Sequence, residues 1–133
     1  LAWALLSLAT VQVFLGALVR HFDVALHVHI TGAVLVFFLG LFTGFRAWGL
    51  HGELPQLRRT GLALLVIVVV QFALGFAALV AAGATAEQTE RPAVDVLLTT
   101  AHQAGGALIL AVAALLAAWS VRLLAPTPEG TEP

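Results

Sequence analysis

The sequence predicts an all-α membrane protein: a transmembrane up-down-up-down four-helix bundle with two pseudo-repeated helix pairs. Of the 133 residues, 61% are hydrophobic and 10% are charged, and the mean hydropathy is +1.04, whereas a soluble domain carries about 25% charged residues. Four charge-free runs are each near or above the ~20 apolar residues that cross a bilayer as a helix. Short connections between them make consecutive helices antiparallel neighbours.

The first two helices are predicted at about 1–19 and 24–46, within a single domain that covers residues 1–125. The first apolar run ends at Arg20, and a new one begins after Asp23. Charged side chains are costly inside a bilayer, so these residues are expected near its surface.

The last two helices are predicted at about 60–82 and 95–122. Pro55 lies in the loop before the third helix and Pro92 in the loop before the fourth. The tail 126–133 is rich in Pro, Thr and Glu, a composition typical of disorder.

The charged and sulfur-containing residues exclude several classes of partner and site. All six basic residues are arginines and the net charge is −1, so there is no basic stripe for nucleic acid. Cysteine and methionine are both absent, so a metal or cofactor would have to be held through imidazole, carboxylate or weaker ligands. Residue 1 is leucine, and it is therefore not expected to be the start of translation.

The arginine distribution predicts the orientation in the membrane. Three arginines lie between the second and third helices and one follows the fourth, whereas the other two loops carry one arginine each beside acidic residues. By the positive-inside rule both termini and the middle loop are cytoplasmic. The expected location is a bacterial or archaeal cytoplasmic membrane, with lipid as the first partner. Three tryptophans fit an aromatic belt on the cytoplasmic side: Trp3, Trp48 and Trp119.

Two histidines interrupt apolar runs in matching places. His29 is followed three residues later by Gly32, and His102 is followed three residues later by Gly105. An ionisable side chain inside a membrane helix is a functional candidate because its burial in hydrocarbon is costly. Two such residues in one pattern predict a shared ligand.

The depth of the histidines supports pairing His29 with His102. His29 follows Asp23 by six residues and His102 follows Asp95 by seven, which places both roughly 10 Å inside their helix starts. His27 is the rival on the second helix, but two residues of separation turn it roughly 200° around the helix. Only one of His27 and His29 can therefore face the bundle axis.

The level pair predicts a b-type heme with His29 and His102 as its axial ligands. Zinc or copper bound by two imidazoles alone would be short of ligands. Two other interpretations stay open. One is a pair of neutral imidazoles hydrogen-bonded to a backbone carbonyl or to a glutamine, and the other is a proton or ion pathway.

Small and polar residues surround the predicted site. Gly32 and Gly105 would let a flat macrocycle approach, or would serve close helix packing. Gln12 and Gln71 each precede a glycine by four residues and share a helix face with it. Arg20 follows Gln12 by eight residues, at the outer end of the same face, where it could pair with heme propionates or anchor the helix at the membrane interface.

Two segments resemble the heme A synthase family of cytochrome oxidase assembly factors. The run Gln12-Val-Phe-Leu-Gly-Ala-Leu-Val-Arg-His21 resembles the first-helix signature of the family. The segment from Leu64 through Gln71-Phe-Ala-Leu-Gly75 to His102-Gln103 is similar to its closing helix pair. The resemblance implies oxidation of the heme O methyl group to the heme A formyl group. It also implies a second copy or a second four-helix half as partner, together with oxidase assembly factors or an electron donor.

One departure from the family concerns catalysis. Family members carry a catalytic glutamate three residues before the first ligand histidine, and here Leu26 stands three residues before His29. An enzyme is still expected from the resemblance. The alternative is a non-catalytic b-type cytochrome or a heme-carrier subunit of a respiratory membrane complex.

The topology predicts the outcome of reporter fusions. A reporter inserted at Gly52 should be found on the cytoplasmic side and one at Gln88 on the opposite side. The third helix, which crosses the membrane once, separates the two loops. Finding both reporters on one side would contradict four spans.

Overall fold

The protein is a bundle of four long helices. The computed structural model describes residues 1–86 and 90–124. The helices are α1 (Ala2–Phe22), α2 (Leu26–Leu50), α3 (Pro55–Ala84) and α4 (Ala93–Leu124). All four are long and apolar enough to cross a membrane, and the all-α fold predicted from the sequence is confirmed. The chain is an integral membrane protein.

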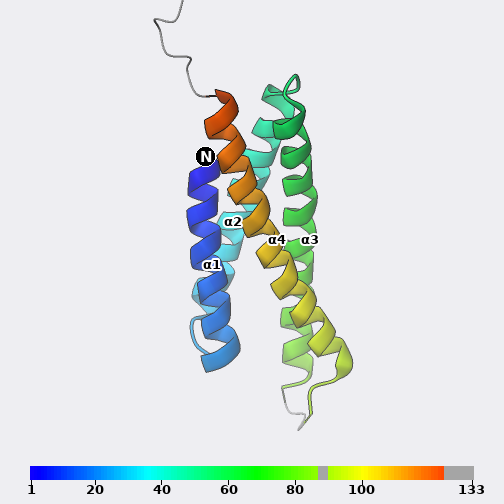
Figure 1. Ribbon diagram of the computed structural model, residues 1–133. Coiled ribbons are helices and arrows are strands. Elements are labelled where there is room, and N and C mark those ends of the chain that lie inside the picture. Colours follow the sequence, from blue (N-terminus) through cyan, green and yellow to red (C-terminus); the bar gives the residue numbers. More distant parts are fainter. Residues whose placement is uncertain (87–89, 125–133) are drawn as a thin grey trace, which may run out of the picture.

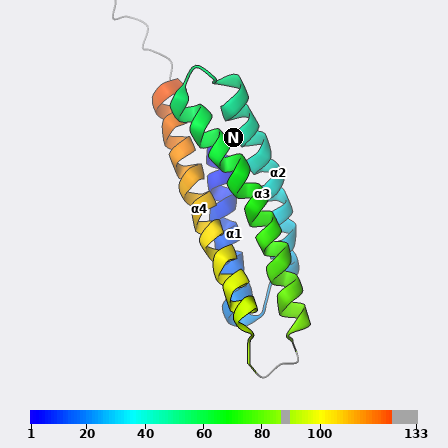
Figure 2. The same cartoon turned by 90° about the vertical axis from the view of Figure 1, so that its right-hand side faces the viewer.

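The helices run alternately up and down, as Figures 1 and 2 show. The start of α1, the α2–α3 connection and the end of α4 lie toward one end of the bundle, and the α1–α2 connection lies toward the other. Each helix packs against its two neighbours in the order α1, α2, α3, α4 and back to α1, and α3 packs most extensively. In the part of the chain that the structure describes, the diagonal pairs α1/α3 and α2/α4 have no close backbone approach.

The helix ends differ from the predicted ones by one to five residues. α3 begins at Pro55, in its first turn, rather than near residue 60, and proline is favourable there because its missing N–H would be unpaired anyway. Arg20 lies inside α1, beyond the predicted end at residue 19, because a helix can continue into the interface where an exposed charge reaches water. The predicted disordered tail 126–133 lies outside the described residues.

The connection from α1 to α2 is a tight turn. Asp23 ends α1 with a φ of 53°, and Ala25 precedes α2 with a φ of 66°. Both values fall in the left-handed region, which is unfavourable for residues that carry a Cβ. This turn brings the two helices of the first pair close together at the end of the bundle away from the termini.

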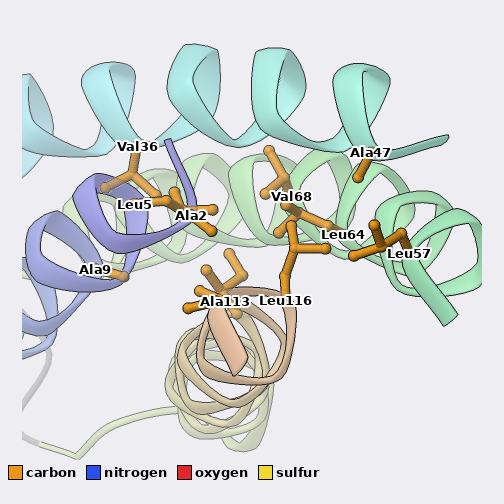
Figure 3. Packing of buried hydrophobic residues seen from close by; sticks show 12 residues of the cluster. Ala2, Leu5, Ala9, Val36, Ala47, Leu57, Leu64, Val68, Ala113 and Leu116 are labelled. Atoms are coloured by element: carbon orange, nitrogen blue, oxygen red, sulfur yellow. The ribbon is translucent and has the colours of Figure 1, made fainter. Parts of the chain in front are cut away.

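The aliphatic core occupies one half of the bundle (Figure 3). Its twelve residues come from the first part of α1 and α3 and the later part of α2 and α4, and Leu5, Leu64 and Ala113 are completely buried. In the other half, Ala78 is the one buried hydrophobic residue among those described. Large apolar side chains such as Phe14 and Phe76 point outward instead, which suits a surface in contact with lipid. The half of the bundle away from the termini therefore has few buried aliphatic side chains among the described residues.

Glycines allow α2 and α3 to pack closely near the core. A Cβ added to Gly61 would lie 2.8 Å from the carbonyl oxygen of Gly44 and 2.8 Å from the backbone nitrogen of Trp48. Both neighbours are backbone atoms and cannot rotate away. Close approach through small residues is a common way for membrane helices to associate.

We expect Gly61→Ala to lower the thermal midpoint of the protein in detergent. The added methyl group forces the helix backbones apart, at a cost typical of overpacking, about 1–3 kcal/mol. Gly49→Ala is the matched control, since no atom lies within 4 Å of a Cβ at that position. An equal shift in both variants would argue against a tight α2–α3 contact.

Candidate functional site

The structure brings His29 and His102 together across the diagonal of the bundle. Their ring centroids are 6.4 Å apart and the ring planes are at 88°. The two residues come from α2 and α4, whose backbones do not approach each other closely. His27 is exposed. Of the two neighbouring histidines of α2, it is therefore His29 that faces His102.

A glutamine from the preceding helix is hydrogen-bonded to the backbone of each histidine. The Gln12 Nε2 atom of α1 donates to the carbonyl oxygen of His29 at 2.5 Å, and the Gln71 Nε2 atom of α3 donates to the carbonyl oxygen of His102 at 2.8 Å. An amide buried in lipid has no water to bond to, so these contacts are strongly favoured. They fix the height of each histidine against the neighbouring helix.

A glycine one turn beyond each glutamine makes room for the imidazole. A Cβ on Gly16 would lie 3.1 Å from Cε1 of His29, and a Cβ on Gly75 would lie 2.7 Å from Cε1 of His102. Each ring therefore lies against bare backbone of the neighbouring helix. A larger side chain at either glycine would displace the ring.

The glycines that follow the histidines contact the glutamines of the neighbouring helix, which agrees with the close helix packing expected for them as one of two roles. A Cβ on Gly32 would overlap Oε1 of Gln12, and a Cβ on Gly105 would overlap Oε1 of Gln71. The reason is that each glutamine must reach across the helix interface to its carbonyl acceptor. Gly32 and Gly105 therefore accommodate the glutamine side chains.

The two helix pairs repeat one set of contacts. In both α1–α2 and α3–α4, a glutamine bonds to the carbonyl of a histidine, and one glycine lies beside the ring while another lies beside the glutamine. The pseudo-repeat in the sequence thus has a structural counterpart. The two rings occupy equivalent positions on opposite sides of the bundle axis.

Four polar atoms of the site are buried without a hydrogen-bond partner. They are Nδ1 of both histidines and Oε1 of both glutamines: His29, His102, Gln12 and Gln71. Buried polar atoms are nearly always paired in proteins, and an unpaired one points to a bound molecule or a functional role. Here the unpaired atoms occur in two symmetric sets at one level of the bundle.

Comparison of the chain with protein-family models, curated proteins and solved structures finds no match. The chemistry of the site has to be inferred from its own residues.

The donor set does not suit an ion held by protein alone. Within residues 1–86 and 90–124, no group of three or more His, Cys, Asp or Glu side chains could hold a metal ion. The two imidazoles alone would leave such an ion short of ligands.

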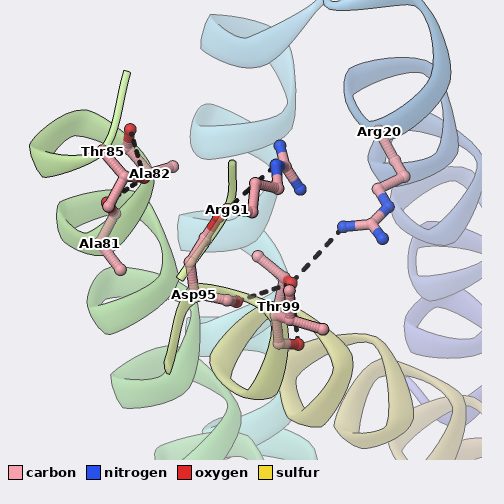
Figure 4. A network of polar contacts seen from close by, with 8 residues as sticks. Arg20, Ala81, Ala82, Thr85, Arg91, Asp95 and Thr99 are labelled. Carbon is pink, nitrogen blue, oxygen red and sulfur yellow. Dashed lines mark hydrogen bonds and ion pairs between the residues drawn. The ribbon is translucent and has the colours of Figure 1, made fainter. Parts of the chain in front are cut away.

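A second polar group lies near the end of α1 and the start of α4 (Figure 4). Arg20 Nη1 donates to Thr99 Oγ1 at 3.5 Å. Asp95 is 1% exposed, and its Oδ2 atom is 3.6 Å from Nε of Arg91. Thr99 also donates to the carbonyl oxygen of Asp95 at 2.8 Å. Arg20, expected to face a propionate, thus bridges to α4 in this structure.

Asp95 is a further candidate residue of the site, although from the sequence alone it marks only a helix boundary. It lies four and seven residues before Thr99 and His102, so the three side chains share one face of α4. The signal that could have indicated its burial is Arg91 four residues earlier, the spacing of a helical ion pair. A carboxylate at the start of a helix is also favoured by the helix dipole.

We expect Gln71→Leu to destabilise the protein in detergent by about 0.6–1.7 kcal/mol, the range measured for side-chain hydrogen bonds between membrane helices. The leucine cannot donate to the carbonyl of His102. Gln56→Leu serves as control because Gln56 is exposed near the start of α3. Chemical or thermal unfolding would measure the difference, and equal effects of the two substitutions would contradict the bridging role of Gln71.

Proposed function

We propose that the chain is an integral-membrane heme-binding protein that holds a b-type heme between His29 and His102. The observation that carries the proposal is the spacing of 6.4 Å between the two ring centroids. Two imidazoles that face each other across the bundle at this distance could hold one metal ion between them, with its other ligands supplied by the cofactor.

The surroundings of the histidines support a planar cofactor. The half of the bundle that contains the site has almost no buried aliphatic residues, in contrast to the half with the core. A porphyrin would supply the other ligands of the iron, so His29 and His102 could hold it without a third protein ligand. The other two interpretations, paired neutral imidazoles and an ion pathway, would not require this spacing.

The site residues have distinct roles in this proposal. His29 and His102 would bind the iron, while Gln12 and Gln71 hold the histidine backbones at equal height. Arg20 would turn from Thr99 toward a propionate at the outer end. A bound heme would supply a one-electron carrier, and with two protein histidines as ligands it would serve electron transfer rather than oxygen binding.

A heme A synthase-like activity is the second candidate, favoured by the resemblance of the run from Gln12 to His21. Leu26 stands where the family carries its catalytic glutamate, so this bundle suits the half that holds the electron-carrying heme. A second copy or a second four-helix half would then bind heme O. Without such a partner the chain would act as a cytochrome or as a heme carrier in a respiratory complex. In either case we place both termini in the cytoplasm and the histidines near the outer face.

We expect the protein from heme-replete cells to show the absorption spectrum of a low-spin heme with two imidazole ligands. His29→Ala and His102→Ala should each remove the heme or convert it to a high-spin form, because each variant leaves one axial ligand. His27→Ala is the matched control on the same helix, and its spectrum should stay unchanged. Loss of heme only in His27→Ala would contradict the assignment, as would a colourless wild-type protein that gives no spectral change with added heme.

Mass spectrometry of the extracted pigment separates the two activities. Coexpression with a source of heme O should yield hydroxylated or formylated heme if the chain is an oxidase of the methyl group. Heme O that stays unmodified in the presence of a competent electron donor would favour the cytochrome or carrier role.

A further inference from the structure

Two hollows flank the start of α3 at the end of the bundle opposite the histidines. The first has a volume of about 230 Å³ and is lined by Trp48, Gly52, Pro55, Arg58, Arg59 and Leu62. The second has a volume of about 250 Å³ and is lined by Pro55, Gln56, Arg59, Thr60 and Trp119. Pro55 and Arg59 belong to both. Arg59 therefore stands between the two hollows.

The hollows are positively charged. Neither hollow has a carboxylate in its lining. Among residues 1–86 and 90–124 the ion pair present joins Arg91 and Asp95 at the other end of the bundle, so it does not neutralise the arginines of the hollows. Arg58 and Arg59 are exposed. Guanidinium groups bind phosphate oxygens through two parallel hydrogen bonds, which a single ammonium group cannot do. The chemistry of the lining thus favours a phosphate group.

Apolar residues in the same linings indicate that the phosphate belongs to a lipid. Leu62 is 50% exposed on α3, one turn from Arg58 and Arg59, and Trp48 is 40% exposed at the end of α2. Tryptophan is enriched at the level of the headgroups in membrane proteins. Inorganic phosphate has no apolar part that could contact these side chains, whereas the glycerol and upper acyl chain of a phospholipid would contact them.

We propose that these hollows bind the headgroup phosphate of an anionic phospholipid, with Arg59 as the shared ligand. Basic pockets at the membrane surface recognise acidic lipids in this way. The site is separate from the histidines, and it does not depend on the heme proposal.

The test compares phosphatidylglycerol with phosphatidylcholine, each titrated into the full chain in detergent and measured by native mass spectrometry. Phosphatidylglycerol should bind preferentially, and Arg59→Gln should weaken its binding about fivefold, the effect of one cationic charge near a lipid headgroup. Arg59→Lys should recover only part of the affinity, because the paired hydrogen bonds are lost. Arg46→Gln is the matched control, since Arg46 is exposed at the same end and lines neither hollow.

Three results would overturn the proposal. The first is equal binding of the two lipids, and the second is an equal loss in Arg46→Gln and Arg59→Gln, which would indicate diffuse charge attraction. The third is displacement of phosphatidylglycerol by an equal concentration of inorganic phosphate, which would assign the hollows to a free anion. Circular dichroism of each variant checks that the helices are intact. We expect no change, because Arg59 is exposed and its replacement leaves the core unchanged.

Discussion

The hydrogen bond from a glutamine amide to the carbonyl oxygen of a histidine on the next helix sets the geometry of the site. A buried amide in lipid must find an acceptor within the protein, and in both helix pairs the acceptor is the histidine backbone itself. The bond requires glycine at the contact on each side, because the glutamine lies against one glycine and the imidazole against another. The height and rotation of each histidine therefore follow from the packing of its own helix pair.

Stability and function are separated along the bundle. Aliphatic packing and the close approach of Gly44 and Gly61 lie in the half with the chain termini. The other half contains the histidines and glutamines with their unpaired atoms. Unpaired polar atoms lower stability, and they can be tolerated when another part of the fold supplies the packing. The tightly packed half thus acts as the rigid support for the polar half.

Much of this arrangement could be predicted from the sequence, because a long apolar segment that crosses a bilayer has few alternatives to a helix. Charge-free runs of sufficient length determine the number of helices. The depth of His29 and the spacing to glycine that it shares with His102 favour it over His27. The helix ends were less accurate, since charged residues such as Arg20 continue the helix into the interface. For Gly32 the structure agrees with the packing role, but the contact with Gln12 could not be predicted, because spacing along one helix does not reveal which side chain of a neighbour fills the space. Asp95 was missed for the same reason, as its burial depends on contacts between helices.

The repeated contacts of the two helix pairs also bear on how such a fold can arise. One helical hairpin with a glutamine, a histidine and their glycines carries half of the site, and two copies related by a twofold axis would complete it. The end of α2 and the start of α3 lie at the same end of the bundle, so a short loop is enough to join two such hairpins into one chain. Duplication and fusion of such a hairpin would account for the repeated contacts. Arg20 departs from the repeat, since Leu79 stands eight residues after Gln71 where Arg20 stands eight residues after Gln12.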